Sequence, residues 1–248
     1  MYNPLEQFAI VPVIRLYNDW LDLTVTNSTI MMLLSVLVII LISGGNNKII
    51  GNKWQRFIEL AYVKVEEIVK DMCGKSGIKY IPFIFNIFIF ILLQNVIGLI
   101  PYSFTTTSHI AITLTLSLSI IIGVTFIGFR KHSLGFFNLF IPSGLNTGFI
   151  RILIPLIFTI ELISYLTRII SLSVRLTANM MSGHTLLKII ANFGVKATSP
   201  IYLVYLVPVI SGLVLIPVVL LELGVAVIQA YVFAMLTASY IKDAELLH

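Results

Sequence analysis

Two apolar runs in the second half of the chain constrain its fold most strongly. Residues 149–193 and 201–240 are each roughly twice as long as the ~20 residues that cross a bilayer as a helix. As unbroken helices they would measure about 60 Å, against a hydrocarbon core of about 30 Å. Each run is therefore either two spans with a hidden turn or one steeply tilted helix. The lack of a polar break favours the tilted helix.

The clearest turn signal between the two runs is GVKATSP at residues 194–200. We therefore expect two long, tilted membrane helices that form an antiparallel hairpin over residues 149–246. Pro155, Pro208 and Pro217 could kink these helices.

Composition sets the class of protein. Of 248 residues, 58% are hydrophobic and only 11% are charged, which is typical of an integral membrane protein and leaves no soluble domain of useful size. The length allows about five or six helical spans. The net charge of +5 is clustered, so it indicates orientation in the membrane and no binding of nucleic acid. We expect one all-α membrane domain over residues 1–248.

The first part of the chain predicts a leader, a span and a surface helix. Residues 1–28 mix polar and apolar side chains, and residues 29–43 reach spanning length when part of 21–28 joins them. Residues 54–72 place apolar side chains on one helical face and charged ones mostly on the other. Such an amphipathic helix should lie on the membrane surface, because there is no soluble core for it to pack on.

A spanning hairpin follows over residues 80–129. Its loop at 102–109 has no Asp, Glu, Lys or Arg, whereas residues 48–79 hold seven Lys or Arg and residues 130–132 are Arg, Lys and His. By the positive-inside rule, the basic segments lie on the matrix or cytoplasmic side, and the uncharged loop and the N-terminus lie on the other.

Charged residues inside the first long run are the strongest functional signal. A charge in lipid costs about 2.5 to 3.5 kcal/mol on insertion scales, so an intramembrane charge is by default functional. Glu161, Arg168 and Arg175 are spaced by seven, which places them on one stripe of a helix, and Asn179 continues it. His184 lies half a turn away from this stripe and must face a different neighbour.

The second run carries Glu222, Gln229 and Asp243, which fall within about 60° of one another on a helix. A tight turn at 194–200 would leave Glu222 about 18 Å out of level with His184. The depth of these side chains therefore depends on where the return helix begins.

One register aligns the polar residues of both runs. If the turn extends to Gly212, His184 pairs with Glu222 at one depth, and Glu161 pairs with Asp243 at another. We adopt this register as a hypothesis.

The resulting arrangement suits proton transfer. Carboxylates and an imidazole exchange protons and bind water, whereas Arg175, between the two patches, stays charged and can hold an anion without passing on a proton. The sequence has no nucleotide-binding loop, no zinc-like His/Cys cluster and no paired haem-ligand histidines. We therefore expect no metal, no cofactor and no catalysis within this chain.

The same residues have structural alternatives. Arg168 and Glu161 could form a contact two turns apart, or each could be an interfacial anchor. His184 could be a hydrogen-bonded core histidine, and Asp243 could be solvated near the C-terminus. Hydrogen bonds between membrane helices would account for the two amides, Asn179 and Gln229.

The stretch SLSVRLTANMMSGH closely resembles the signature of subunit a of rotary ATP synthases. The resemblance covers nearly the full length, and PLEQF, IPYSF and LTASYIKDAELLH look like the fungal mitochondrial form. It implies a multi-pass protein of the mitochondrial inner membrane that is not an enzyme on its own. Its expected role is that of a proton-translocating stator subunit with two offset half-channels. The partners implied are a rotating c-subunit ring and other membrane-sector and peripheral-stalk subunits.

The resemblance also implies residue roles. Arg175 matches the arginine that faces the ring carboxylates and separates the half-channels. His184 and Glu222 match the half-channel open to the intermembrane space, and Glu161 and Asp243 match the matrix half-channel. Supporting polar positions are Arg168, Asn179, Gln229 and Asn95.

Two functions from other classes are alternatives. A secondary ion transporter with an intramembrane site would be expected to show inverted repeats, and the two halves of this sequence show no similarity. A purely structural membrane anchor would leave the polar residues unexplained, and it predicts that Arg175 tolerates a neutral replacement.

Overall fold

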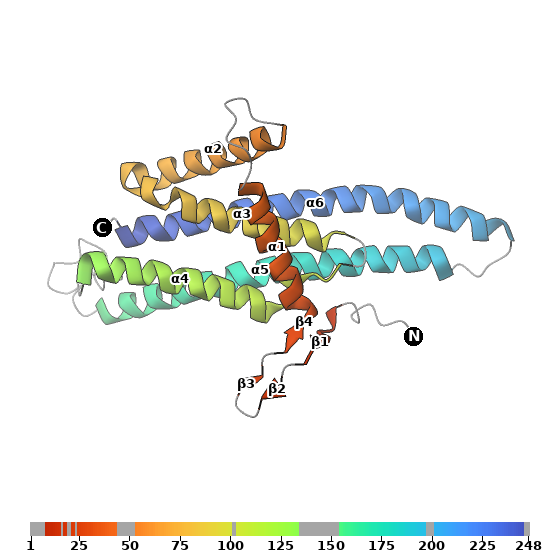
Figure 1. Cartoon of the computed structure of the whole chain (residues 1–248), viewed down its shortest axis with the longest axis horizontal. Helices are drawn as coiled ribbons and strands as arrows, with labels where there is room; N and C mark the ends of the chain where they lie inside the picture. Colours follow the sequence, from red (N-terminus) through yellow and green to blue (C-terminus); the bar gives the residue numbers. More distant parts are fainter. Residues whose placement is uncertain are drawn as a thin grey trace. The chain divides into compact units, whose positions relative to one another are not determined.

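The computed structural model describes residues 8–15, 17–18, 21–22, 24–43, 53–100, 103–133, 154–196 and 201–245. Most of this part is helical, as the all-α class predicts (Figure 1). The chain divides into two compact units. The first unit comprises Met1–Gly44, Ile89–Ile110 and Leu176–Ala230, and the second comprises Gly45–Phe88, Ala111–Arg175 and Tyr231–His248.

The elements follow one another in a simple order. The strands are β1 Pro12–Ile14, β2 Tyr17–Asn18, β3 Leu21–Asp22 and β4 Val25–Thr26. The helices are α1 Asn27–Ser43, α2 Lys53–Cys73, η2 Gly74–Tyr80, α3 Ile81–Gly98, η3 Thr106–Ser108, α4 Ile110–His132, α5 Ile154–Lys196 and α6 Ile201–Glu245. Within the residues that the structure describes, four segments are long and apolar enough to cross a membrane: Gly77–Gly98, Ile110–His132, Pro155–Asn192 and Val207–Glu245.

The two long runs form single helices, α5 with 43 residues and α6 with 45. The prediction of unbroken helices is therefore confirmed for the described part, which omits residues 149–153. The expected extension of the turn to Gly212 is wrong, because α6 begins at Ile201 and continues through Pro208. In an apolar setting a helix satisfies nearly every backbone group, so the one hydrogen bond lost at a proline does not end it.

In the first unit, Asn27 and Ser28 join the first predicted span, as expected when part of residues 21–28 extends it. Residues 21–22 and 25–26 do not extend α1 further, because β3 pairs with β2 and β4 pairs with β1 in antiparallel ribbons. The helix begins at Asn27, whose backbone N–H donates to the carbonyl of Val11 over 3.2 Å. With 17 residues, α1 is about 25 Å long, at the short end of what spans a bilayer.

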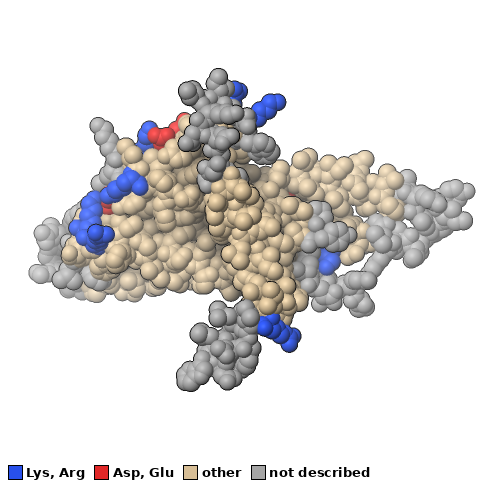
Figure 2. Space-filling view, in the orientation of Figure 1, with Lys and Arg blue, Asp and Glu red and all other residues tan. Residues whose placement is uncertain are grey.

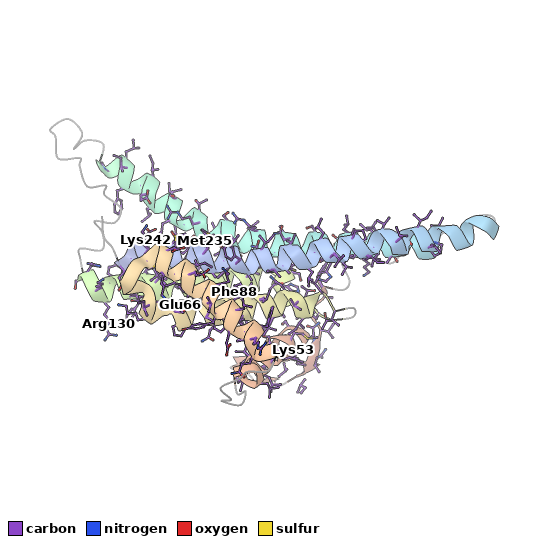
Figure 3. The ribbon with its side chains drawn as sticks, turned by 90° about the horizontal axis from the view of Figure 1, so that it is seen from above. Lys53, Glu66, Phe88, Arg130, Met235 and Lys242 are labelled. Carbon is purple, nitrogen blue, oxygen red and sulfur yellow. The ribbon has the colours of Figure 1, made fainter. Side chains whose placement is uncertain are left out.

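In the second unit, α2 confirms the predicted amphipathic helix at 54–72. Part of its apolar stripe is packed within the unit, where Val65, Ile68 and Val69 are buried. Cys73 Sγ donates to the carbonyl of Ala238 on α6 over 3.2 Å. In Figure 3 the end of α2 beyond Glu66 accordingly lies next to the part of α6 that carries Lys242. The C-terminal half of α2 therefore packs on a membrane helix of the same chain.

The end of α6 is held by charged contacts within the second unit. The Glu245 side chain is only 2% exposed, and its Oε1 lies 2.6 Å from Lys79 Nζ and 3.5 Å from Lys131 Nζ. The Lys131 ammonium also donates to the Glu245 carbonyl over 3.1 Å. These contacts tie the last turn of α6 to the last turn of α4 and to η2.

Much of the described surface is apolar. In the view of Figure 2, Lys, Arg, Asp and Glu occupy only small parts of the described surface. Exposed large side chains are especially frequent on α6, among them Val209, Leu213, Ile216, Leu220, Leu221 and Ile228. Such a surface suits contact with lipid or with other membrane helices.

Candidate functional site

A histidine and a carboxylate from the two long helices meet in the first unit. His184 Nε2 on α5 lies 3.9 Å from Glu222 Oε1 on α6, so the predicted pair forms, although the turn at Gly212 on which its register rested does not. The Glu222 side chain is only 4% exposed, and neither of its oxygens has a hydrogen-bond partner among the described residues. Thr105 Oγ1 lies 3.1 Å from the same histidine nitrogen. We call His184, Glu222 and Thr105 the histidine cluster.

A glycine next to the histidine makes this close approach possible. A Cβ atom on Gly183 would lie 2.4 Å from Glu222 Oε1 and 2.7 Å from its Cδ, well inside van der Waals contact. The absent side chain therefore leaves the space that the Glu222 carboxylate fills.

Amide side chains continue the polar contact between helices in the same unit. Asn179 Nδ2 donates to Gln229 Oε1 over 3.2 Å, which joins α5 to α6 between one and two turns from the histidine cluster. Asn95 Nδ2 on α3 donates to the carbonyl of Ala226 over 3.4 Å. These bonds support the interpretation of the amides as links between membrane helices.

The other predicted carboxylates meet around an arginine in the second unit. Arg168 Nη2 lies 3.6 Å from Glu161 Oε1, and Arg168 Nη1 lies 3.7 Å from Asp243 Oδ2. Both distances are too long for hydrogen bonds, and all three side chains are partly exposed. The carboxylates therefore remain accessible to water. We call Glu161, Arg168 and Asp243 the arginine cluster.

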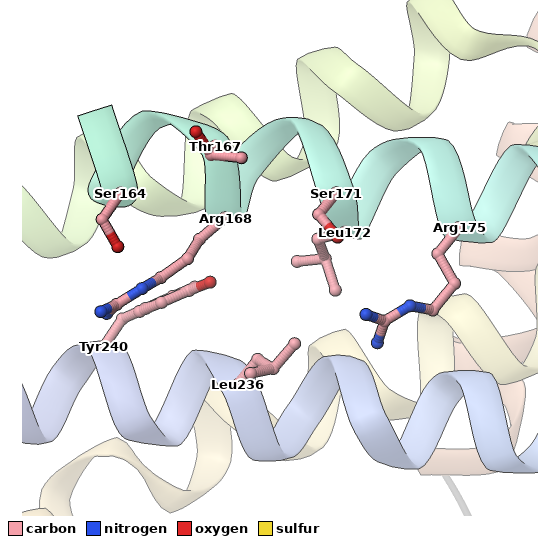
Figure 4. Close-up of a pocket in the computed structure, with 8 residues that line it drawn as sticks. All are labelled: Ser164, Thr167, Arg168, Ser171, Leu172, Arg175, Leu236 and Tyr240. Carbon is pink, nitrogen blue, oxygen red and sulfur yellow. The ribbon is translucent and has the colours of Figure 1, made fainter. Parts of the chain in front are cut away.

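An open pocket of about 390 Å³ extends from Arg168 to Arg175 within this unit. Figure 4 shows both guanidinium groups reaching from α5 toward α6, with Tyr240 beside Arg168 and Leu236 between the two arginines. Hydroxyl groups from α5 line the same pocket, at Ser164, Thr167 and Ser171. Arg175 is exposed and has no ion-pair partner among the described residues, in contrast to Arg168.

The structure adds residues that the sequence did not single out. Thr105 comes from the uncharged loop at 102–109, where a run of hydroxyl residues was the only signal. Gly183 appeared only as part of the signature SLSVRLTANMMSGH, and Tyr240 had no signal of its own because tyrosine is common in apolar helices. Across the described residues, no group of three or more His, Cys, Asp or Glu side chains is placed to hold a metal ion.

The chemistry available is acid–base chemistry in an apolar protein. The histidine cluster pairs an imidazole with a buried carboxylate, and the arginine cluster holds two partly exposed carboxylates near one cation. Both sets of groups can take up and release protons, while Arg175 offers a fixed positive charge.

Comparison with known proteins gives a match along almost the whole chain. Residues 25–242 match the sequence family described as ATP synthase A chain. The chain is 41% identical over 255 residues to ATP synthase subunit a of Rhodospirillum rubrum, with 100% of both chains covered. It is 42% identical over 252 residues to ATP synthase subunit a of Trichophyton rubrum, covering 99% of this chain and 97% of that one. It is also 42% identical over 256 residues to ATP synthase subunit a of Pelagibacter ubique, covering 99% and 98%. Bacterial and fungal relatives thus match about equally well.

Proposed function

Because this chain belongs to the ATP synthase A chain family and is a proton-translocating stator subunit, we propose that its two polar clusters are the two half-channels of the proton path. The chain is a non-catalytic component of the proton-transporting ATP synthase and works in a complex with other subunits of that enzyme. ATP chemistry therefore takes place elsewhere in the complex.

The main support for the proposal is the exposed charge of Arg175. Its charge lies in a membrane-length helix, exposed at a pocket and without an ion-pair partner in the described part of the chain. An arginine that only stabilised the fold would be expected to pair within its own chain. Arg175 instead keeps an exposed charge at an open pocket, where a carboxylate of another subunit can meet it.

The histidine cluster is the entry side in this proposal. His184 and Glu222 take up a proton from the intermembrane space and pass it to a carboxylate of the rotating c-subunit ring. The buried Glu222, which lacks a hydrogen-bond partner among the described residues, supports this role, because a buried carboxylate without partners is costly to keep charged.

The arginine cluster is the exit side. Glu161 and Asp243 accept the proton from the ring and release it to the matrix, and the hydroxyl-lined pocket beside them has room for water. Arg168 holds the two carboxylates near each other. The supporting polar residues in the first unit are Asn179, Gln229 and Asn95.

Rotation follows from the cost of charge in lipid. A ring carboxylate that has gained a proton is neutral and can turn into the lipid, whereas the charged form would be expensive there. After losing its proton on the exit side, the carboxylate is attracted to Arg175, which also blocks direct proton leak between the half-channels. Each proton crossing is worth about 2.3 kcal/mol per 100 mV, and this bias gives the rotation its direction.

The complex lies in a membrane, and we propose the mitochondrial inner membrane, in a fungal-type enzyme. The terminal segments PLEQF and LTASYIKDAELLH and the loop sequence IPYSF support this location. The partners proposed in the same membrane are the c-subunit ring and the remaining membrane-sector and peripheral-stalk subunits.

The test is replacement of Arg175 by alanine in the intact complex. We expect Arg175→Ala to assemble but to lose ATP-driven proton pumping, because nothing then attracts the ring carboxylate or separates the half-channels. Recovery of the whole complex verifies assembly, and passive proton leak is measured in the same membranes. The matched control is Arg130→Ala, an exposed arginine at the end of α4 that should leave pumping unchanged. Pumping by Arg175→Ala at close to the parental rate would show that Arg175 is structural and that the mechanism is wrong.

A further inference from the structure

The loop between α3 and α4 places a hydroxyl group against His184. Thr105 Oγ1 is 3.1 Å from His184 Nε2, whereas the Glu222 oxygen is 3.9 Å from the same nitrogen. A ring nitrogen carries either one proton or one lone pair, so it makes one good hydrogen bond at a time. In this structure His184 Nε2 makes that bond with the Thr105 hydroxyl, and the Glu222 oxygen lies beyond hydrogen-bond distance.

Local hydrogen bonds fix the backbone around Thr105. The Ser103 hydroxyl lies within hydrogen-bond distance of three carbonyls at and just after the end of α3 and can donate to one of them at a time, and Ser108 Oγ donates to the carbonyl of Thr105 itself over 2.6 Å. The threonine methyl group packs against Gly98, where an added Cβ would lie 2.8 Å from Thr105 Cγ2. The Thr105 side chain is therefore held in one place by its surroundings.

A second, buried chain of hydrogen bonds anchors the same loop. Thr106 Oγ1 donates to Gln94 Oε1 on α3, and Gln94 Nε2 donates to Ser35 Oγ on α1 over 2.8 Å. All three side chains are buried. The loop is thus tied to two helices of its unit, which makes it a firm support for the hydroxyl of Thr105.

We propose that Thr105 is a positioning residue of the proton path, whose hydroxyl orients His184 toward Glu222 and accommodates both protonation states of the imidazole. A hydroxyl group is both donor and acceptor. It donates to Nε2 when that nitrogen is unprotonated and accepts from Nε2–H when it is protonated. This inference rests on the proposed function of His184 and Glu222 in proton transfer.

Few groups of the described residues face His184, so an effect on its protonation can be assigned. Glu222 on α6 is the titratable group packed against it, and Lys188 lies one turn further along α5. The loop contributes the hydroxyl of Thr105, and the N-terminal segment contributes the ring of Phe8, edge-on at 6.4 Å between centroids. Neither of these last two groups titrates near neutral pH.

The test compares variants of two neighbouring threonines in the assembled complex. Thr105→Val removes the hydroxyl and keeps the shape, and Thr105→Ser keeps the hydroxyl. The matched control is Thr107→Val, because Thr107 is buried in the same loop and its Oγ1 has no hydrogen-bond partner among the described residues. The measurement is the rate of ATP-driven proton pumping as a function of pH, with His184→Ala in the same series.

We expect Thr105→Val to slow pumping about two- to tenfold, the equivalent of one lost hydrogen bond, and to move the midpoint of the pH profile. Thr105→Ser should restore both the rate and the profile, and Thr107→Val should match the parent. A purely structural role for Thr105 would lower the yield of complex without moving the pH profile.

The outcomes separate this proposal from the one it rests on. If His184→Ala loses pumping while Thr105→Val keeps the parental rate and profile, the positioning role of Thr105 is overturned. If His184→Ala itself pumps normally, the proposed function of the histidine cluster fails first. If Thr105→Val does not assemble, Thr105→Ala and Thr105→Ser are compared. A pH profile of pumping that is shifted in Thr105→Ala and unshifted in Thr105→Ser then supports the proposal, and identical profiles in the two variants overturn it.

Discussion

Glu222 reaches His184 because position 183 has no side chain. Alanine at this position would place a Cβ 2.4 Å from Glu222 Oε1, and that oxygen is the free end of a flexible side chain. Gly183→Ala should therefore displace the carboxylate and leave α5 intact, since alanine favours a helix over glycine by about 1 kcal/mol. We predict normal assembly with proton pumping reduced about ten- to a hundredfold, as expected when a reacting group moves by about 1 Å.

The control for this substitution is Gly212→Ala on α6, where an added Cβ would have no neighbour within 4 Å among the described residues. It should pump like the parent in the same membranes. Parental pumping by Gly183→Ala would mean that the separation of His184 and Glu222 does not limit proton transfer.

Two arginines seven residues apart on α5 have different surroundings. Arg168 lies between Glu161 and Asp243, and so fits the structural alternative of a charge contact two turns apart. Arg175 has no such partner in the described part of the chain. Their spacing in the sequence placed Arg168 and Arg175 on the same stripe of a helix. Only the structure distinguishes them, because it shows carboxylates beside Arg168 and none beside Arg175 in the described part of the chain.

At the scale of elements, the sequence predicted the helices well and the short segments poorly. The helices α2 to α6 follow from apolar length and helical periodicity, which are local properties of the chain. The strands β1 to β4 have two or three residues each, and their pairing across the ribbon, not their own sequence, defines them. The predicted turn at Gly212 failed because Gly and Pro signals are weak inside an apolar helix.

The candidate site was predictable to the extent that it is charged. A charged or amide side chain in an apolar run stands out because burying it in lipid is costly, and this signal identified His184, Glu222, Glu161 and Asp243. Thr105 and Gly183 carry no such cost. Their importance comes from which atoms they approach, and that follows only from the packing of the loop and of α5 against α6.

The packing of α2 on α6 can be tested through the one cysteine of the chain. Cys73 is buried at the end of α2, and burial raises the pKa of its thiol. The thiolate is the form that reacts, so a raised pKa keeps the thiol neutral and slow to alkylate near neutral pH. We predict alkylation more than about tenfold slower than that of an exposed cysteine, with the rate still climbing at pH values where the exposed thiol has levelled off.

The exposed comparison is Asp71→Cys in a Cys73→Ser background, because Asp71 lies on the charged, exposed face of the same helix. Serine keeps a donor for the carbonyl of Ala238. Equal alkylation rates at the two positions would show that α2 lies apart from α6 and rests on the membrane surface alone.

At the scale of the whole molecule, each polar cluster lies in a unit whose segments at the membrane surface differ in their content of Lys and Arg. The first unit contains the uncharged loop with Thr105, together with His184 and Glu222. The second contains α2, which carries Lys53, Arg56, Lys64 and Lys70, and the basic end of α4, together with the arginine cluster. The positive-inside rule assigns basic segments to the matrix side. This distribution supports entry through the histidine cluster and exit through the arginine cluster.

That assignment predicts on which side of the membrane the ends of α3 and α4 are accessible to a labelling reagent. Ile100, 56% exposed after α3, should face the intermembrane side, and Arg130, exposed near the end of α4, should face the matrix. In the Cys73→Ser background, Ile100→Cys and Arg130→Cys are treated with a membrane-impermeant maleimide in sealed vesicles of known orientation. We expect one variant to be labelled before permeabilisation and the other only after it, with the order reversed in inverted vesicles. Labelling of both from the same side would overturn the topology, and with it the assignment of the two clusters to opposite half-channels.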